Sequence, residues 1–223
     1  METTSGRFFR FEMIYRCFET DKKYLKESGQ VDPGQILTVT GPSGSGKSTL
    51  LKILARLLKP QSGEVFWHDR NWHAFSPTEW RRGIQFVSQK PVVFPGLIKD
   101  NFRLPFTLKN QKEKADLSMD QVIEYMERTG LSVRMLTQEA KSMSGGEAAR
   151  LALIRALTIE PEILLLDEPT AFLDHDSRIK TISLLNEWVK EKQRAIIVVS
   201  HQEDDLKYLD CQTVLTLPVR KAG

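Results

Sequence analysis

Nine consecutive residues rich in glycine and serine have the composition of a phosphate-binding loop. They are Gly41, Pro42, Ser43, Gly44, Ser45, Gly46, Lys47, Ser48 and Thr49. Glycine lets the backbone curl so that successive N–H groups point at one anion, and Lys47 adds a positive charge for the outer phosphates. The Ser48 hydroxyl can ligate Mg²⁺ beside those phosphates. We therefore expect a site for a nucleoside triphosphate rather than an ordinary surface loop rich in glycine and serine.

A pair of acidic residues, Asp167 and Glu168, follows the apolar run Ile163 to Leu166. A carboxylate fixed at the end of a buried strand can hold the metal shell, which is the role we predict for Asp167. Glu168 follows on the opposite face, where it can orient or deprotonate an attacking water. An acidic pair alone is more often a solvated surface pair. The combination with the glycine-rich loop upstream favours a catalytic site.

Ser144, Gly145 and Gly146 stand at the start of a predicted helix that runs through Leu151 and Ile154. The first N–H groups of a helix have no partner within the helix, and the helix dipole favours negative charge at that end. We therefore predict a second anion receptor here, with exposed N–H groups.

The elements that must position these groups alternate along the chain. Strand-like apolar runs are Ile36 to Val39, Gly83 to Val87, Ile163 to Leu166 and Ala195 to Val199, and the glycine-rich loop precedes a predicted helix over Leu50 to Leu58. Alternation of strands with helices is typical of a mostly parallel sheet covered by helices. In such folds ligands bind at the carboxyl ends of the strands, where both predicted phosphate and metal groups lie.

Several helix boundaries follow from local patterns. Ser76–Glu79, with proline at the first helical position, and Ser118–Gln121 are both predicted capping boxes. Gly130 is predicted to end the helix that follows Ser118, and Asp176 to open a further one. The stretch Lys90 to Lys141 is therefore predicted to be mainly helical and inserted between strands.

In their order and spacing, these segments resemble the motifs of the ABC ATPases. Met143–Glu147 resembles the signature motif of that family, and Ile163–Thr170 resembles its Walker B strand with the catalytic glutamate. Ala171–Asp174 resembles the D-loop, Gln89 the Q-loop glutamine and His201 the switch histidine. The resemblance covers nearly the whole chain.

The resemblance implies an α/β P-loop NTPase fold. The expected fold has a mostly parallel core sheet, an antiparallel β subdomain and an inserted helical subdomain. We expect residues 1–223 to form a single ABC ATPase domain, with the helical subdomain at roughly 90–158.

The same resemblance implies ATP hydrolysis with ATP and Mg²⁺ as cofactors. Glu168, His201 and Gln89 are the expected catalytic residues, and Ser48, Gln89 and Asp167 the expected metal ligands. The expected nucleotide contacts are Phe18, Gly41, Pro42, Ser43, Gly44, Ser45, Gly46, Lys47, Ser48, Thr49, Ser144, Gly145, Gly146, Glu147 and Asp174.

The chain departs from the family pattern at a few positions. Methionine precedes the signature serine where leucine is usual, and Glu147 replaces the usual glutamine, which puts a carboxylate close to a phosphate site. Ala171–Phe172 stands where Ser-Ala is common. The position of the adenine-stacking aromatic residue points to Phe18 rather than Tyr15, and a core aromatic on the first strand is an equal alternative.

Composition excludes several classes of protein. The net charge of +3 is mixed along the chain, so no nucleic-acid partner is expected. The longest apolar runs, Ile163–Leu166 and Ala195–Val199, are too short to span a bilayer, and polar Met1–Gly6 gives no signal-peptide core. Cys17 and Cys211 are predicted to be free thiols.

In the ABC family the signature motif faces the γ-phosphate held by another subunit. The resemblance therefore implies a head-to-tail dimer of this chain in its ATP-bound state. It also implies a separate multi-span membrane subunit, a cytoplasmic location on the inner face of the membrane, and transport driven by ATP. Leu153–Leu157 and Lys99–Phe102 give a finer resemblance to the small ATPase subunit of an iron-export ABC system.

Two rival classes are weighed against transport. A soluble ABC ATPase acting on DNA or ribosomes would have a long coiled coil between Gln89 and Ser144, or a second cassette, and the sequence has neither. A kinase sharing only the phosphate loop would lack the signature motif. After Gln89, four apolar side chains either fill the core of the helical subdomain or line a groove for a helix of the membrane subunit: Phe94, Phe102, Leu104 and Phe106.

Overall fold

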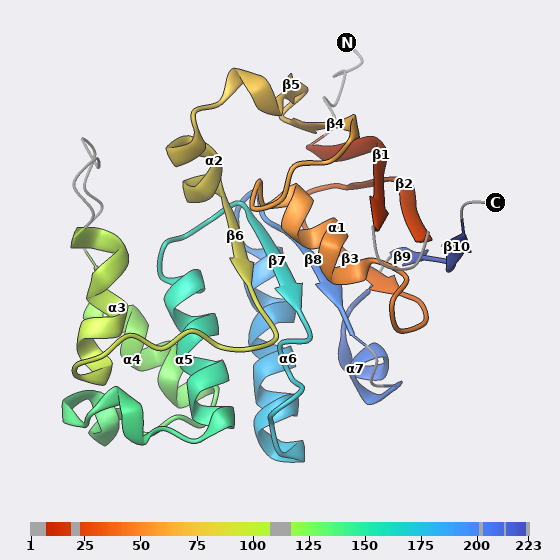
Figure 1. The fold of residues 1–223 in the computed structure, drawn as a ribbon. Coiled ribbons are helices and arrows are strands. Elements are labelled where there is room, and N and C mark those ends of the chain that lie inside the picture. Colours follow the sequence, from red (N-terminus) through yellow and green to blue (C-terminus); the bar gives the residue numbers. More distant parts are fainter. Residues whose placement is uncertain (1–7, 19–22, 108–116, 201–202, 212, 222–223) are drawn as a thin grey trace, which may run out of the picture.

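A five-stranded parallel sheet forms the centre of the computed structural model, which describes all residues except 1–7, 19–22, 108–116, 201–202, 212 and 222–223 (Figure 1). The strand order is β6-β7-β8-β3-β9, and each neighbouring pair is parallel. The strands are β3 (Ile36–Thr40), β6 (Ile84–Val87), β7 (Ile163–Asp167), β8 (Ala195–Val199) and β9 (Thr213–Thr216). The four predicted strands are confirmed to within a residue at each end, and β9 was not predicted.

The inner strands are apolar at successive positions because both faces of the sheet are covered. Alternate residues of β8 enter different cores: Ile197 packs on the side of α1 (Lys47–Leu54), and Ile196 on the side of α5 (Gly145–Leu157) and α6 (His175–Lys190). Helix α1 and helix α5 therefore lie on opposite faces of the parallel sheet.

A second five-stranded sheet packs over α1 on its side of the molecule (Figure 1). Its order is β10-β2-β1-β4-β5, and all its pairs are antiparallel. The strands are β1 (Phe9–Phe18), β2 (Lys23–Val31), β4 (Ser62–Trp67), β5 (Arg70–Asn71) and β10 (Arg220–Lys221). The expected antiparallel β subdomain is thereby confirmed, together with the α/β class.

The remaining helices are η1 (Trp72–Ala74), α2 (Pro77–Gly83), α3 (Ile98–Thr107), α4 (Met119–Arg128), η2 (Val133–Thr137), η3 (Ala140–Ser142) and α7 (Glu203–Tyr208). Of these helices, η1 and α2 connect the two sheets, α7 lies between β8 and β9, and the others lie between β6 and β7. Over its described residues, the stretch Lys90 to Lys141 is mainly helical as predicted, although residues 90–97 form no helix and Leu97 makes an isolated bridge to Glu139. The subdomain boundaries at 90 and 158 stay a prediction.

Helix boundaries show where local patterns were sufficient. Ser76 makes the predicted capping box with Glu79. Ser118 caps α4 through the Gln121 N–H, but the Gln121 amide contacts Tyr125 and Glu160 instead of closing the box. Gly130, at φ 72°, follows the end of α4 as predicted.

Two predicted boundaries were wrong. Helix α1 ends at Leu54 rather than at residue 58, because Arg56 takes a left-handed conformation at φ 56° and donates to the carbonyls of Trp72 and Phe75. Helix α6 begins at His175 rather than at residue 176, because the carboxylate of Asp174 accepts the N–H of Ser177 and is the N-cap.

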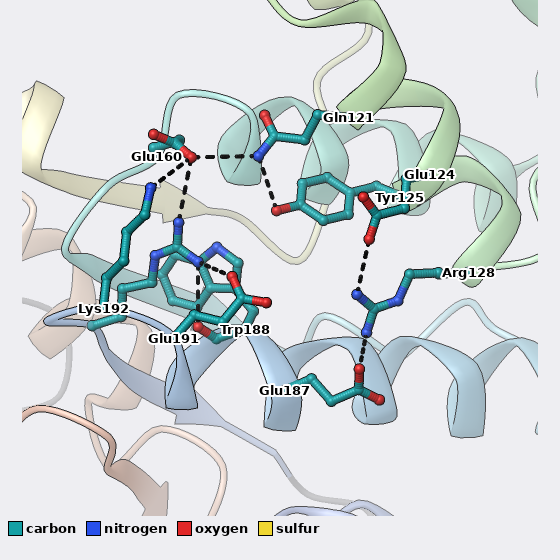
Figure 2. Close-up of polar contacts among 10 residues, drawn as sticks. Gln121, Glu124, Tyr125, Arg128, Glu160, Glu187, Trp188, Glu191 and Lys192 are labelled. Carbon is teal, nitrogen blue, oxygen red and sulfur yellow. Dashed lines mark hydrogen bonds and ion pairs between the residues drawn. The ribbon is translucent and has the colours of Figure 1, made fainter.

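Polar contacts join α4 to α6 and to the loop after α5 (Figure 2). Arg128 bridges Glu124 at 3.3 Å and Glu187 at 2.6 Å, and Lys192 donates to Glu160 at 3.0 Å. The hydrogen bond from Lys192 is the main reason that the pKa of Glu160 is lowered. The interaction between Glu160 and Lys192 therefore stabilises the fold above the pKa that Glu160 has in the unfolded chain. This stabilisation is lost as the pH falls through the lower pKa of Glu160 in the folded protein.

Arg194 gives the first test of this region, because its side chain is only 3% exposed. It stacks 4.6 Å from the ring centre of Trp188 and donates to Glu191 at 3.0 Å. We expect Arg194→Ala to lower the free energy of unfolding by about 2 kcal/mol, because packing and charge-assisted hydrogen bonds are lost together. Arg128→Ala, on a more exposed arginine, should cost less than about 1 kcal/mol. Urea unfolding measures both, and equal losses would contradict this account.

Candidate functional site

The glycine-rich loop joins β3 to α1, and three of its glycines have left-handed backbone angles. Their φ values are 137° at Gly41, 76° at Gly44 and 99° at Gly46. A Cβ at Gly41 would also lie 2.3 Å from the carbonyl oxygen of Leu217. Only glycine takes such conformations without strain, so the sequence composition of the loop is explained by its path.

Lys47 places its amine inside the curve of this loop. Its Nζ donates to the carbonyls of Gly41 and Pro42, each at 2.9 Å, and the residue is 6% exposed. Burial lowers the pKa of the Lys47 amine, and the opposing attraction of Glu168 and Asp167 is smaller. A phosphate beside the amine would supply a stronger, charged acceptor than the two carbonyls.

The loop fits a triphosphate on two observations. The Ser45 hydroxyl is buried and has no hydrogen-bond partner in the described part of the chain, and this oxygen lies 3.0 Å from where a Gly41 Cβ would be. A buried hydroxyl without a partner is costly, and a phosphate oxygen would satisfy it. The curved backbone at Gly44 and Gly46 leaves room for that anion at the N-terminus of α1.

Ser48 and Asp167 meet between α1 and the end of β7. The Ser48 hydroxyl donates to Asp167 Oδ1 at 2.9 Å, and Asp167 is 5% exposed. Over the ranges that the structure describes, no cluster of three or more His, Cys, Asp or Glu could hold a metal. Two protein oxygens beside a phosphate site fit Mg²⁺, which is usually bound by one or two protein groups with phosphates and water.

Glu168, the residue after β7, and Gln89, in the segment after β6, also come together. Gln89 Nε2 donates to Glu168 Oε2 at 2.8 Å. Glu168 has a φ of 50°, and its N–H donates to the carbonyl of Val199 on β8 at 2.9 Å. A left-handed glutamate costs energy and such strain is concentrated at functional sites, which supports the predicted catalytic role. His201, the predicted switch histidine, lies outside the described residues.

Ser144 is the N-cap of α5, and Glu147 changes the expected picture of its N-terminus. Glu147 Oε2 accepts the Ser144 N–H at 2.8 Å and the Ser144 hydroxyl at 2.9 Å, and the Glu147 N–H donates back to Ser144. The prediction of freely exposed donors was therefore wrong for Ser144. The sequence could have predicted this capping box, because Ser144 and Glu147 have the same spacing as Ser76 and Glu79.

The D-loop packs against the tip of α5 within the same chain. A Cβ at Gly146 would lie 2.8 Å from the Phe172 carbonyl oxygen, and one at Gly145 would lie 3.9 Å from Phe172 Cδ1. Both carboxylate oxygens of Asp174 accept from Ser177, and the backbone hydrogen bond is the main reason that the pKa of Asp174 is lowered. The assigned nucleotide contact of Asp174 stays a prediction.

Phe18, rather than Tyr15, lies beside the phosphate loop. A Cβ at Gly46 would be 3.2 Å from Phe18 Cζ, whereas the ring of Tyr15 pairs with that of Tyr24 at 5.7 Å. Phe18 also packs against the core beneath it. The geometry supports Phe18 as the aromatic residue closer to a bound nucleotide, and stacking on adenine stays a prediction.

A surface groove lies beside Gln89, between β6, α2, α3 and α5. Its volume is about 1040 Å³, and Leu57, Val92, Phe94 and Leu104 are among its lining residues. Val92 is 52% exposed and Phe94 is 40% exposed, whereas Phe102 is fully buried. Of the two interpretations of the apolar side chains after Gln89, Phe102 therefore follows the core interpretation, and Phe94 and Leu104 line a groove.

Comparison with known proteins decides the family of the chain. A family model described as ABC transporter matches residues 26–171, a range that includes the phosphate loop, Gln89, the signature motif, Asp167 and Glu168. The chain belongs to the ABC transporter family. It is therefore an ATP-binding, ATP-hydrolysing cassette with the P-loop NTPase fold.

Curated relatives of this ABC cassette differ in what they are named for. The probable iron export ATP-binding protein FetA of Escherichia coli is 34% identical over 184 residues, which are 82% of this chain and 79% of that protein. The phosphate import ATP-binding protein PstB of Aeropyrum pernix is 36% identical over 201 residues, or 82% of this chain and 76% of that one.

A solved structure agrees with the fold and with hydrolysis. The dimeric post-hydrolysis state of the ATP-binding cassette MJ0796, bound to ADP and Pi, has a TM-score of 0.80 at 25% identity. The match covers 97% of this chain and 100% of that one. In the described part of this ABC cassette, none of the helices combines the length and apolar character that crossing a bilayer requires.

Lys47→Ala tests the phosphate loop. We expect the affinity for ATP to fall at least about tenfold, since a hydrogen bond to a charged group contributes about 1.5–3 kcal/mol. Lys52→Ala, on the exposed side of the same helix, is the matched control and should leave ATP affinity within about twofold. Titration with a fluorescent ATP analogue measures both variants. Normal affinity in Lys47→Ala would contradict the assigned role.

Proposed function

We propose that this chain energises transport through a separate multi-span membrane subunit by closing on ATP as a head-to-tail pair. One observation carries the proposal: α1, which starts at the phosphate loop, and α5, which starts at the signature motif, cover opposite faces of the parallel sheet. The phosphate loop and the signature motif of one chain therefore begin helices that belong to different cores, and in the proposed pair each completes the site that the other copy holds. The dimeric state of MJ0796 with ADP and Pi supports the pairing.

In this proposal the phosphate loop binds the β- and γ-phosphates, with Lys47 in contact with both. Ser48 and Asp167 would hold Mg²⁺, which would supply positive charge beside the phosphates, and Gln89 is a further candidate ligand. Glu168, held by Gln89, orients the water and accepts its proton as the water oxygen attacks the γ-phosphorus. The bond to the bridging oxygen breaks, and ADP leaves with that electron pair.

The second copy contributes the signature motif above the γ-phosphate. Gly145 and Gly146 present backbone N–H groups there without side chains, and Phe172 lies beside them. In this proposal Phe18 of the first copy contacts the adenine of the same nucleotide, and Asp174 contacts the nucleotide across the pair. His201 completes the set by its position in the sequence after β8.

The membrane partner is proposed to dock in the groove beside Gln89. Its exposed apolar side chains, Val92 and Phe94, suit a short amphipathic helix, and the groove adjoins the segment that carries Gln89. Contact there would connect the partner with the group that holds Glu168. The chain would then be cytoplasmic and peripheral, on the inner face of the membrane.

Iron export is the finer proposal for the transported substrate. Its support is the FetA relative at 34% identity, together with the local resemblance at Leu153–Leu157 and Lys99–Phe102. The PstB relative, at 36% identity, is named for phosphate import, so identity at this level does not separate substrates. The substrate pathway would lie in the membrane subunit. Relatives named for transport do not favour the alternative of a soluble ABC ATPase acting on DNA or ribosomes.

Glu168→Gln tests the pairing. An amide can still accept from Gln89 but cannot take a proton from water, so hydrolysis should fall at least about a hundredfold while ATP stays bound. We expect a dimer to accumulate with ATP in size-exclusion chromatography with light scattering. Glu187→Gln, an exposed change on α6, is the control and should hydrolyse ATP normally. A Glu168→Gln chain that stays monomeric with ATP, even with its membrane partner present, would remove the proposal.

Val92→Glu tests the docking groove. The chain would be tagged, co-expressed with a candidate multi-span membrane subunit, and purified in detergent. We expect the membrane protein to be recovered at least about tenfold less with Val92→Glu, because a charge would be buried in an apolar contact. Val214→Glu is matched in exposure, 58% against 52%, and lies on β9. Equal recovery with both variants would exclude this groove as the docking site.

A further inference from the structure

A buried carboxylate outside the assigned site joins four separate segments of the chain. Asp205, on α7, is 2% exposed, and its Oδ2 accepts from Thr170 Oγ1 at 2.5 Å and from Ser200 Oγ at 2.6 Å. Arg178 Nε of α6 lies 3.7 Å from Oδ1. Thr170 and Ser200 are themselves 2% and 3% exposed, so this cluster is closed off from water.

The two hydroxyls that Asp205 binds flank the proposed chemistry. Thr170 comes two residues after Glu168, and Ser200 follows Val199, whose carbonyl accepts the Glu168 N–H at 2.9 Å. The end of β7 and the end of β8 are therefore tied twice, by the backbone at Glu168 and by one carboxylate oxygen of Asp205. The second connection depends on a single side chain, that of Asp205.

Burying the Asp205 carboxylate costs more free energy than burying an apolar side chain at the same position would. A carboxylate that leaves water must be compensated by donors and opposite charge. Here Oδ2 accepts two hydrogen bonds, whereas Oδ1 has the Arg178 guanidinium at 3.7 Å and no hydrogen bond within the described ranges. An apolar side chain of similar size would avoid that cost. What an apolar side chain could not do is accept from both hydroxyls and hold Thr170 and Ser200 at one separation.

We propose that Asp205 is a positioning residue for ATP hydrolysis. By accepting from Thr170 and Ser200 together, it fixes the segment after β7 against the segment after β8. Glu168 thereby keeps the left-handed backbone and the orientation in which Gln89 contacts it. The side-chain partners of Asp205 are residues assigned neither to the nucleotide nor to the metal, so its effect falls on turnover and not on ATP binding, which the loop between β3 and α1 carries. The inference rests on the proposed function of Glu168.

The test compares steady-state hydrolysis and ATP affinity in three variants of the full chain. Asp205→Asn keeps the size, but its neutral amide accepts more weakly from both hydroxyls and turns an NH2 group toward Arg178, so we expect kcat to fall at least about tenfold with ATP affinity within about twofold. Ser200→Ala and Thr170→Val remove one hydroxyl each and should lower kcat by smaller factors. In the Asp205→Asn background their further effect should shrink, because residues that share one interaction are not additive.

Thr181→Val is the matched control. Thr181 is also fully buried, and its hydroxyl donates only along its own helix, to the Ser177 carbonyl at 2.7 Å. It should leave kcat within about twofold. If Asp205→Asn fails to fold, Ser200→Ala carries the test. The inference would be overturned if kcat and ATP affinity fell in equal proportion. It would also be overturned if kcat were unchanged in Asp205→Asn and Ser200→Ala, or in Ser200→Ala alone where Asp205→Asn does not fold. Persistent hydrolysis in Glu168→Gln would instead overturn the proposed function, so the two failures are distinguishable.

Discussion

Burial of both faces of the parallel sheet is the constraint on which the arrangement of the site depends. Strands that are apolar at every position must be covered twice, and alternate residues of β8 enter two different cores. Helices α1 and α5 are thereby held on opposite faces of the sheet, so the phosphate loop and the signature motif begin helices that belong to different cores. In the proposed pairing, this separation is the reason that a second copy completes each site.

The carboxyl ends of these strands gather the reacting groups for the same reason. Asp167 ends β7 beside Ser48 of α1, and Gln89 follows β6 beside Glu168. Parallel neighbours end at one edge of the sheet, so residues far apart in sequence meet there. The strained backbone of Glu168 is tolerated because Val199 and Gln89 hold it from both sides.

Much of the sheet and the site could be predicted because the signals are local. Short apolar runs located the inner parallel strands, and glycine spacing located the loop whose backbone angles require glycine. Strand β9 was missed because Thr213–Thr216 is largely exposed and gives no apolar run. The early end of α1 depends on contacts that Arg56 makes with residues distant in sequence, and the Asp205 cluster joins four such segments, so neither had a local pattern.

In the proposed pairing, the carboxylate of Glu147 would limit how long two subunits stay closed. It caps α5 through Ser144, at the point where the proposed pairing brings in a γ-phosphate. Charges of like sign at short range repel, most strongly where water is excluded. In a pair closed on ATP, the Glu147 carboxylate and the γ-phosphate would therefore repel each other at each signature motif. The repulsion would favour departure of the cleaved phosphate and separation of the two subunits. Glu147 would therefore speed the opening of the pair, while its hydrogen bonds to Ser144 stabilise α5 in the unpaired chain.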